Sequence, residues 1–265
     1  MGVSVIIASH NCEAYIEECL LSLFNQSYEG EIEIIVCDDC SSDGTYSILE
    51  NYANAGKIIL MRNSQNLGPA LTRNRCLARA SHEFVAIQDA DDYSHPDRLY
   101  ILVSNLNNNP NVGFVSSGLR CFYEDGSTFD IIPKKKHPAK SDFLMTLPFP
   151  HATTMFRKEV IDRVGGYDNF SRAEDYYLFM KIYAQGFVGM NISDILYFYR
   201  CFKTNKNKSK YSIRINEAKV RYKGFKLLGF GLRGLPYVIK PLVLGLLPEK
   251  TQIRIRNHFN KKHEM

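Results

Sequence analysis

The sequence contains no tryptophan, no cysteine pairs with the spacing of a zinc site and no long uncharged apolar run. Seven cysteines include a formal C-x-x-C at Cys37 and Cys40, but this string follows a predicted strand and lacks the helix start of a redox motif. We therefore expect reduced cytosolic thiols. Neither a charged leader nor a long apolar segment precedes the apolar run at 3–7, so no secretory signal is expected.

The most apolar part of the C-terminal region, residues 227–247, is rich in Leu and Gly. Arg233 and Lys240 interrupt it, as do two prolines, so no uncharged run approaches the ~20 residues of a membrane-spanning helix. Two interpretations remain open. The segment either lies in a membrane interface as an amphipathic helix, or forms a helical pair that packs on the main domain.

The net charge of +5 is unevenly distributed along the chain. Residues 200–265 hold 17 Lys and Arg against three acids, whereas residues 1–199 hold 16 basic and 25 acidic side chains. An acidic body with a basic tail predicts an anionic partner for the tail, either a membrane surface or nucleic acid. No nucleic-acid-binding motif accompanies the tail, so we expect an anionic membrane surface and no nucleic acid.

The pattern of apolar residues predicts an α/β fold. Short apolar runs predict buried strands, and amphipathic stretches between them predict helices. The predicted strands are 3–7, 32–37, 57–61, 84–87, 112–116, 151–156 and 195–200, with a hairpin at 118–132, and the predicted helices are 13–24, 45–54, 70–80, 97–107 and 174–184. Repeated strand–helix–strand units indicate a mostly parallel sheet with helices on both faces, which binds ligands beyond the carboxyl ends of its strands. A basic loop at 203–210 marks a boundary, and the pattern from 212 onward is helical.

An acidic cluster follows the predicted strand at 84–87. Asp89, Asp91 and Asp92 place three carboxylates within four positions, so their mutual repulsion requires a compensating cation. Mg²⁺ or Mn²⁺ would take one or two of these carboxylates and complete its shell with phosphate oxygens and water. The alternative is structural, because Asp92 or Ser94 could cap the helix that follows.

A second acid pair, Asp38 and Asp39, follows the strand at 32–37. A carboxylate at this edge can accept a hydrogen bond from a base N–H or a ribose hydroxyl. Ser41, Ser42 and Asp43 offer caps to the helix that follows, so we expect capping by Ser42 or Asp43 and base recognition by Asp39. The helix that opens at Gly68-Pro69 carries Arg73 one turn inside, where a cation suits a diphosphate. Arg73 on a solvated helix face is the alternative.

A third acid pair, Glu174 and Asp175, opens an apolar helix behind the glycine-rich loop at 165–168. Acids favour the positive end of a helix, which is sufficient to explain Glu174. It does not explain why a pair recurs here, far from the first acidic cluster.

Taken together, these strings resemble the family 2 inverting glycosyltransferases of the GT-A fold, over roughly residues 1–200. The segments that carry the resemblance are Val3–Ile7 with Ser9–Asn11, Asp38–Thr45, Gly68–Asn74, Asp89–Asp92 and Gly165–Asp175. Five motifs in the family's order are specific. Departures from the family pattern are Ala8 and His10, where Pro or Thr and Tyr are common, Cys40 in place of Gly, and Thr72 in place of Ala.

The resemblance implies a role for each matching residue. Asp39 would hold a uracil-like base, Arg73 the phosphate region, Asp89 the ribose or a metal-bound water, and Asp91 the metal, Mg²⁺ or Mn²⁺. The other expected donor contacts are Ala8, Ser9, Asn11 and Ala90, with Asp89 as a second metal candidate. Asp175 would be the general base, assisted by Glu174. His151 is a possible contact to donor or metal, or alternatively a core histidine.

The resemblance also implies an organisation and an activity. It divides the chain into a catalytic domain at 1–202, with a nucleotide-binding half at 1–95 and an acceptor-binding half at 96–202, and a basic helical extension at 203–265. We expect transfer of one hexose or N-acetylhexosamine from a UDP-sugar to a saccharide acceptor, held on polyprenyl diphosphate, in bacterial surface-polysaccharide synthesis at the inner face of the cytoplasmic membrane. The alternatives are a nucleotidyltransferase and a non-catalytic nucleotide-sugar-binding protein.

Overall fold

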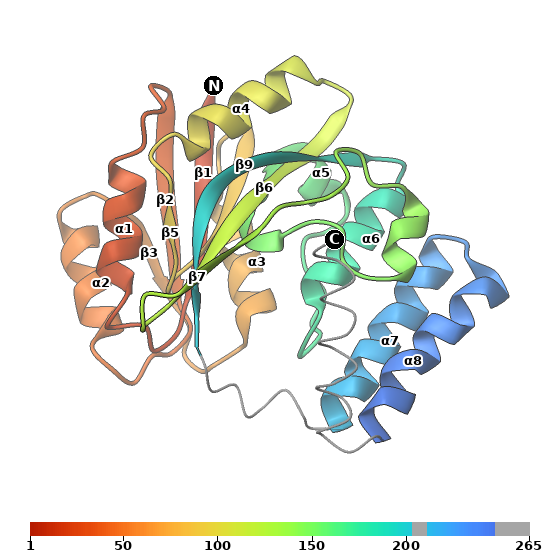
Figure 1. Cartoon of the computed structure of the whole chain (residues 1–265). Coiled ribbons are helices and arrows are strands. Elements are labelled where there is room, and N and C mark those ends of the chain that lie inside the picture. Colours follow the sequence, from red (N-terminus) through yellow and green to blue (C-terminus); the bar gives the residue numbers. More distant parts are fainter. Residues whose placement is uncertain (203–210, 247–265) are drawn as a thin grey trace.

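The computed structural model describes residues 1–202 and 211–246, so the predicted loop at 203–210 and the chain beyond 246 lie outside the described residues. The described part forms a nine-stranded sheet covered by helices on both faces (Figure 1). Its strand order is β3-β2-β1-β4-β8-β6-β9-β5, and β7 pairs with β6 away from this path. The predicted sheet flanked by helices is confirmed.

The first half of the sheet is parallel, as the alternation of strands and helices predicts. Its elements are β1 (Gly2–Ser9), α1 (Ile16–Phe24), β2 (Glu31–Asp38), α2 (Thr45–Asn54), β3 (Ile59–Arg62), α3 (Pro69–Arg79) and β4 (Phe84–Asp89). β1 lies between β2 and β4, with Ser9 opposite Asp38 and Ala8 opposite Asp89. This register brings the polar ends of three strands to one edge of the sheet.

The second half of the sheet is mixed. Its elements are β5 (Tyr93–Ser94), α4 (Arg98–Asn108), β6 (Val112–Tyr123), β7 (Thr128–Ile131), η1 (Lys140–Leu144), η2 (His151–Thr153), β8 (Met155–Arg157), α5 (Lys158–Arg163), α6 (Glu174–Ala184) and β9 (Val188–Cys201). β8 runs antiparallel to both β4 and β6, while β9 is parallel to β6. The predicted hairpin is present as β6 and β7.

The predicted strand at 151–156 is wrong over its first half. Residues His151–Thr153 form a 3-10 turn, and only Met155–Arg157 pair in the sheet. The N–H groups of Thr153 and Thr154 donate to the carbonyls of Pro150 and His151, at 3.2 and 3.0 Å, so they form a turn instead of pairing in the sheet. The prediction at 195–200 is too short, because β9 already begins at Val188.

Two hydrophobic clusters fill the space on the two faces of the sheet. Along β1, Ile6 belongs to the cluster that contains Phe179 of α6, whereas Val5 belongs to the other, with Leu20 of α1 and Leu102 of α4. Successive side chains of a strand point to opposite faces, so a strand apolar on both faces needs two covering layers. The central strands are therefore buried, and their polar ends stand out at the edge.

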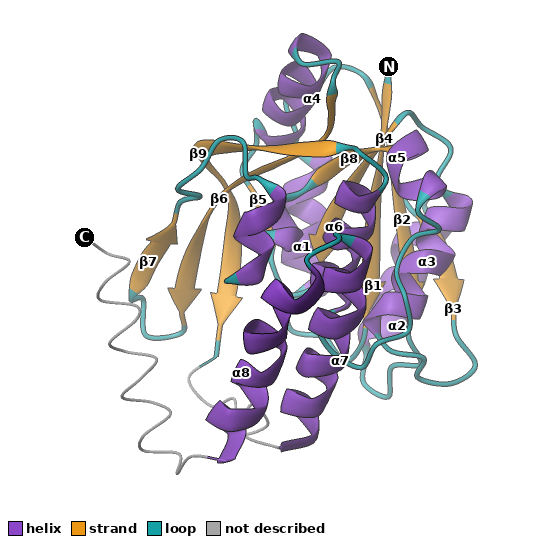
Figure 2. Cartoon of the chain, turned by 90° about the vertical axis from the view of Figure 1, so that its right-hand side faces the viewer, coloured by secondary structure: helices purple, strands orange, loops and turns teal. Residues whose placement is uncertain are grey.

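The described part of the C-terminal region, residues 211–246, is helical, as expected. α7 (Tyr211–Leu227) is followed by η4 (Gly231–Gly234) and α8 (Leu235–Leu246), and Figure 2 shows α7 beside α8. Val220 and Phe225 of α7 join the same core cluster as α6. Within the described ranges, no helix is both long enough and apolar enough to cross a membrane.

Candidate active site

The Asp39 carboxylate lies just beyond β2 and holds the start of α3. One oxygen accepts hydrogen bonds from the Asn63 amide at 2.6 Å and the Leu67 N–H at 2.8 Å, and the other accepts the Gly68 N–H at 2.8 Å. Burial raises the pKa of Asp39, but these bonds outweigh it and the pKa lies below its ordinary value. Asp39 is therefore ionised at neutral pH and can accept a further hydrogen bond.

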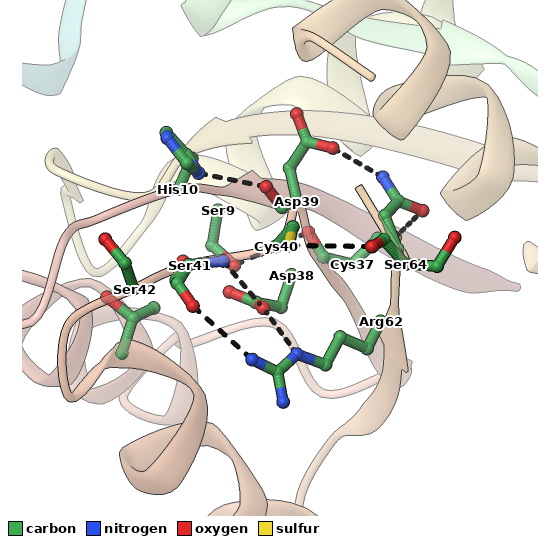
Figure 3. A network of polar contacts seen from close by, with 12 residues as sticks. Ser9, His10, Cys37, Asp38, Asp39, Cys40, Ser41, Ser42, Arg62 and Ser64 are labelled. Carbon is green, nitrogen blue, oxygen red and sulfur yellow. Dashed lines mark hydrogen bonds and ion pairs between the residues drawn. The ribbon is translucent and has the colours of Figure 1, made fainter. Parts of the chain in front are cut away.

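The neighbouring Asp38 lies in a different environment. Its carboxylate is 3.3 Å from Arg62 Nε and accepts the Ser41 N–H at 3.2 Å. Figure 3 shows the Asp39 carboxyl pointing to the side opposite Arg62, while the His10 ring contacts the Asp39 main-chain oxygen. Asp38 thus stabilises the loop after β2, and Asp39 is left to face the edge of the sheet.

The expected donor contacts from β1 brace this same loop. The Ser9 carbonyl accepts the Asp39 N–H at 2.8 Å, and the Asn11 side chain accepts the Ser42 N–H at 2.9 Å. Ala8 lies between β2 and β4 in the sheet. Cys40 has a φ of +60°, the left-handed conformation in which glycine carries no steric penalty. This conformation explains why the family pattern has Gly where this chain has Cys40.

Arg73 of α3 joins two acidic motifs that are distant in sequence. Its guanidinium is 2.8 Å from Asp89 Oδ1 and 3.4 Å from Glu174 Oε1, and its side chain is only 10% exposed. Burial lowers the pKa of Arg73, but the Asp89 charge and hydrogen bond, together with Tyr167 and Glu174, outweigh this and keep the pKa above its usual range. The alternative of Arg73 on a solvated helix face is therefore wrong.

The acidic turn after β4 contains three carboxylates in three environments. Asp89 pairs with Arg73. Burial, followed by the Asp89 charge, raises the pKa of Asp91. Burial, Asp89 and Asp91 together raise the pKa of Asp92 to about 9. Asp92 accepts the Arg200 N–H at 2.7 Å instead of capping α4, which begins after Asp97 without a side-chain cap, so the structural alternative does not hold for Asp92.

No three His, Cys, Asp or Glu side chains converge on a metal position among the residues that the structure describes. A Mg²⁺ or Mn²⁺ bound together with a nucleotide needs only one or two carboxylates, because phosphate oxygens and water supply its other ligands. Burial, and then the Asp89 charge, raises the pKa of Asp91, and the opposing effect of the Arg200 charge is smaller. One carboxylate of this turn, Asp91, is sufficient for an ion bound in this way, and its role as a metal ligand stays a prediction.

The Glu174–Asp175 pair begins α6 on a strained backbone. Ala173, directly before it, has a φ of +61°, which is uncommon for a residue other than glycine. Asp175 accepts the Tyr176 N–H at 2.7 Å. Burial and then the Glu174 charge raise the pKa of Asp175 to about 6, within the range of a general base that works near neutral pH.

His151 and Tyr167 lie next to Arg73 and contact each other. His151 Nε2 is 2.7 Å from the Tyr167 hydroxyl, and the Arg73 guanidinium carbon lies 5.7 Å from the centre of the Tyr167 ring. Burial, followed by the Arg73 charge, lowers the pKa of His151 to about 3, so the ring is neutral. His151 is thus hydrogen-bonded inside the site, and its contact to donor or metal stays a prediction.

Several residues of this site were not singled out from the sequence. The Asn74 amide bonds both the N–H and the carbonyl of Tyr167, at 2.8 and 2.7 Å. Arg98 is fully buried and donates to the carbonyls of Ile87 and Ala152, at 2.6 and 3.1 Å. Asn74 stands inside a recognised motif, so its position was a usable signal. Arg98 had none, because an isolated arginine in a helix normally faces solvent.

A sheet whose parallel half ends in an ionised acid and an Asp-x-Asp turn, with an arginine and a second acid pair beside that turn, is typical of transferases that use nucleotide-sugar donors. The model of the family described as "Glycosyl transferase family 2" matches residues 4–165. The chain therefore belongs to this family and is a glycosyltransferase.

Similar proteins agree with this assignment. EpsE of Bacillus subtilis is 32% identical over 269 residues, 99% of this chain and 94% of that protein. The amylovoran biosynthesis glycosyltransferase AmsE of Erwinia amylovora is 28% identical, over 94% of this chain and 95% of its own length. A crystal structure of Staphylococcus aureus TarS superposes with a TM-score of 0.69 at 24% identity, covering 92% of this chain and 71% of that one. The expected GT-A fold is confirmed.

Proposed function

We propose that this glycosyltransferase moves one hexose or N-acetylhexosamine from a UDP-sugar to a saccharide acceptor, with inversion at the anomeric carbon. The observation that carries the proposal is the position of Arg73, which contacts Asp89 on the expected donor side and Glu174 on the expected acceptor side. The donor phosphates and the acceptor hydroxyl would therefore both lie next to the buried guanidinium of Arg73.

A uridine donor is supported by Asp39 and by similar proteins. The ionised Asp39 carboxylate can accept the N–H of a pyrimidine ring. A relative in Escherichia coli, 28% identical over 78% of this chain and 77% of that protein, is named a UDP-Gal:alpha-D-GlcNAc-diphosphoundecaprenol beta-1,3-galactosyltransferase. TarS, whose fold is similar, has a structure in complex with UDP-GlcNAc.

In the proposed reaction Asp175 takes the proton of the acceptor hydroxyl. The freed oxygen attacks the anomeric carbon as the bond from that carbon to the diphosphate oxygen breaks, so the configuration inverts. Arg73 stays charged and close to the leaving diphosphate. Asp91, with Asp89 nearby, would hold a divalent cation, which would supply positive charge to offset that of the leaving diphosphate.

The acceptor that we propose is a saccharide on polyprenyl diphosphate, in surface-polysaccharide synthesis at the inner face of the cytoplasmic membrane. The Escherichia coli relative is named for an acceptor of this kind, GlcNAc-diphosphoundecaprenol. AmsE is named for the biosynthesis of amylovoran, a polysaccharide. The 17 Lys and Arg against three acids after residue 199 fit an anionic membrane.

A panel of nucleotide-sugars tests the proposal. With Mg²⁺ or Mn²⁺ present, a UDP-hexose or UDP-N-acetylhexosamine should raise the unfolding temperature, and the GDP and CMP sugars should not. Asp91→Ala should abolish the metal-dependent part of UDP binding. Stabilisation by a GDP-sugar alone would contradict the uridine assignment, and a product that retains the donor's anomeric configuration would contradict inversion.

A further inference from the structure

The outer face of α8 and the turn before it carry an apolar stripe that no other part of the described chain covers. We call it the α8 ridge: Leu232, Leu235, Ile239, Val243 and Leu246, which are between 45% and 86% exposed. The members recur every three or four residues and so form one face of the helix. Together with Pro236, Lys240 and Leu244, four of them line an open groove of about 580 Å³.

The opposite face of α8 is fixed to the protein. Tyr237 and Val238 pack against the main core cluster, and Pro241 is buried. A Cβ on Gly245 would lie 2.8 Å from the Arg214 side chain of α7, so the two helices approach closely. Figure 2 shows α8 beside α7. The ridge is therefore displayed by a helix whose orientation is set by packing.

α7 fastens this pair of helices to the catalytic region. A Cβ on Gly224 would lie 2.2 Å from Met180 of α6, which leaves the two helices in direct contact. Arg221 adds a hydrogen bond to the Leu144 carbonyl at 3.1 Å. In the described part of the extension, the inner face of α8 is packed on the protein, and the ridge is the apolar face of α8 that is left exposed for an external partner.

The charge around the ridge indicates which partner. Residues 211–246 contain seven Lys and Arg and one acid, Glu217. Arg233 is exposed next to Leu232, and Lys240 lines the groove. Apolar side chains bordered by cations suit the boundary between the headgroups and acyl chains of an anionic bilayer. A second copy would bring an equally basic surface against this one and be repelled.

We propose that the α8 ridge inserts into the interface of an anionic bilayer and holds the catalytic domain against it. This inference rests on the proposed function for its purpose, because an acceptor anchored in lipid requires the enzyme at the membrane. It also answers the question left open by the sequence. α7 packs on the domain, and α8 offers its outer face to the membrane.

Sedimentation of the full-length protein with vesicles tests this inference. The wild type should bind vesicles of phosphatidylcholine and phosphatidylglycerol, and bind pure phosphatidylcholine vesicles less well. Ile239→Gln with Val243→Gln removes two exposed apolar groups from the ridge, so binding should weaken about tenfold or more. As a matched control, Leu21→Gln with Tyr100→Gln removes exposed apolar groups from α1 and α4 and should leave binding unchanged.

Metal-dependent UDP binding, measured on the same preparations, should be equal in all three proteins. If none of the three proteins bound UDP, this result would count against the proposed function and not against membrane binding by the α8 ridge. The inference is overturned if the wild type does not bind anionic vesicles, or if the ridge variant binds them as well as the wild type does. It is also overturned if light scattering shows a wild-type dimer that the ridge variant abolishes, or if vesicle binding appears only after residues 247–265 are removed.

Discussion

At the scale of single residues, the Asp175 carboxyl has a protonation state that should control the rate. Its pKa is raised to about 6, first by burial and then by Glu174, and a general base acts only when deprotonated. With saturating donor and acceptor, kcat should therefore be constant above about pH 7 and fall about tenfold per pH unit below about pH 6. A rate that stays constant down to about pH 5 would show that another group accepts the proton.

His151 should make stability depend on pH. Burial, and then the Arg73 charge, lowers its folded-state pKa from 6.5 to about 3, so only the unfolded chain takes up this proton near pH 5. His151 therefore favours unfolding as the pH falls below about 6.5. Relative to His151→Gln, the wild type should lose free energy of unfolding between about pH 7 and pH 5, as measured by urea titration. A constant difference between the two proteins would show that His151 titrates normally.

At the scale of elements, Asn74 connects α3 to the glycine-rich loop before α6. Its amide bonds the N–H and the carbonyl of Tyr167, and Gly166 lies so close that a Cβ there would come within 2.5 Å of Asn74 Oδ1. Asn74→Ala leaves both main-chain groups without this partner and should lower the free energy of unfolding by about 1–3 kcal/mol.

Two control variants separate the loss of the Asn74–Tyr167 hydrogen bonds from the effect of placing alanine in any helix. Asn74→Asp keeps an acceptor for the Tyr167 N–H and should retain part of the lost stability, whereas Asn54→Ala, at an exposed position of α2, should change little. Urea unfolding of the three variants decides the matter. Equal stability of Asn74→Ala and the wild type would show that the loop is held by other contacts.

The sequence predicts those elements whose signals are local. The helix at 45–54 has the predicted bounds, and β1 and β4 contain the predicted strands, because the apolar pattern is read within one segment. α1 begins three residues later than expected, since Tyr15 and Ile16 donate to the Cys12 carbonyl in the turn that precedes it. The bounds of the strand at β9 depend on pairing with β6, which the sequence does not display.

For the site, the sequence supplies the participating acids but not their connections. Arg73 pairs with Asp89, 16 residues away at the end of β4, and with Glu174, 101 residues away at the start of α6, and no local pattern contains either contact. The same holds for Arg98, which is buried beneath the acidic turn. The roles expected for Asp39, Asp91 and Asp175 stay predictions, although the structure places each at a strand end or helix start facing the same edge.

At the scale of the whole molecule, the basic extension is joined to the catalytic region by its core. Val220 and Phe225 of α7 are 0% and 3% exposed and belong to the core cluster of α6. A chain that ends at Phe202 should lose about 1.5–3 kcal/mol for each of these side chains and unfold at a lower urea concentration. Equal midpoints for the truncated and the full-length chain would show that the extension is a separable appendage.

The central claim is that donor binding and proton transfer are performed by separate acids that meet beside Arg73. Asp175→Asn tests it most directly, with UDP affinity and sugar transfer measured on the same preparation in the presence of Mg²⁺ or Mn²⁺. We predict a UDP affinity within about twofold of the wild type and a transfer rate lower by about 10²–10⁴-fold. Transfer at a rate close to that of the wild type would contradict the claim.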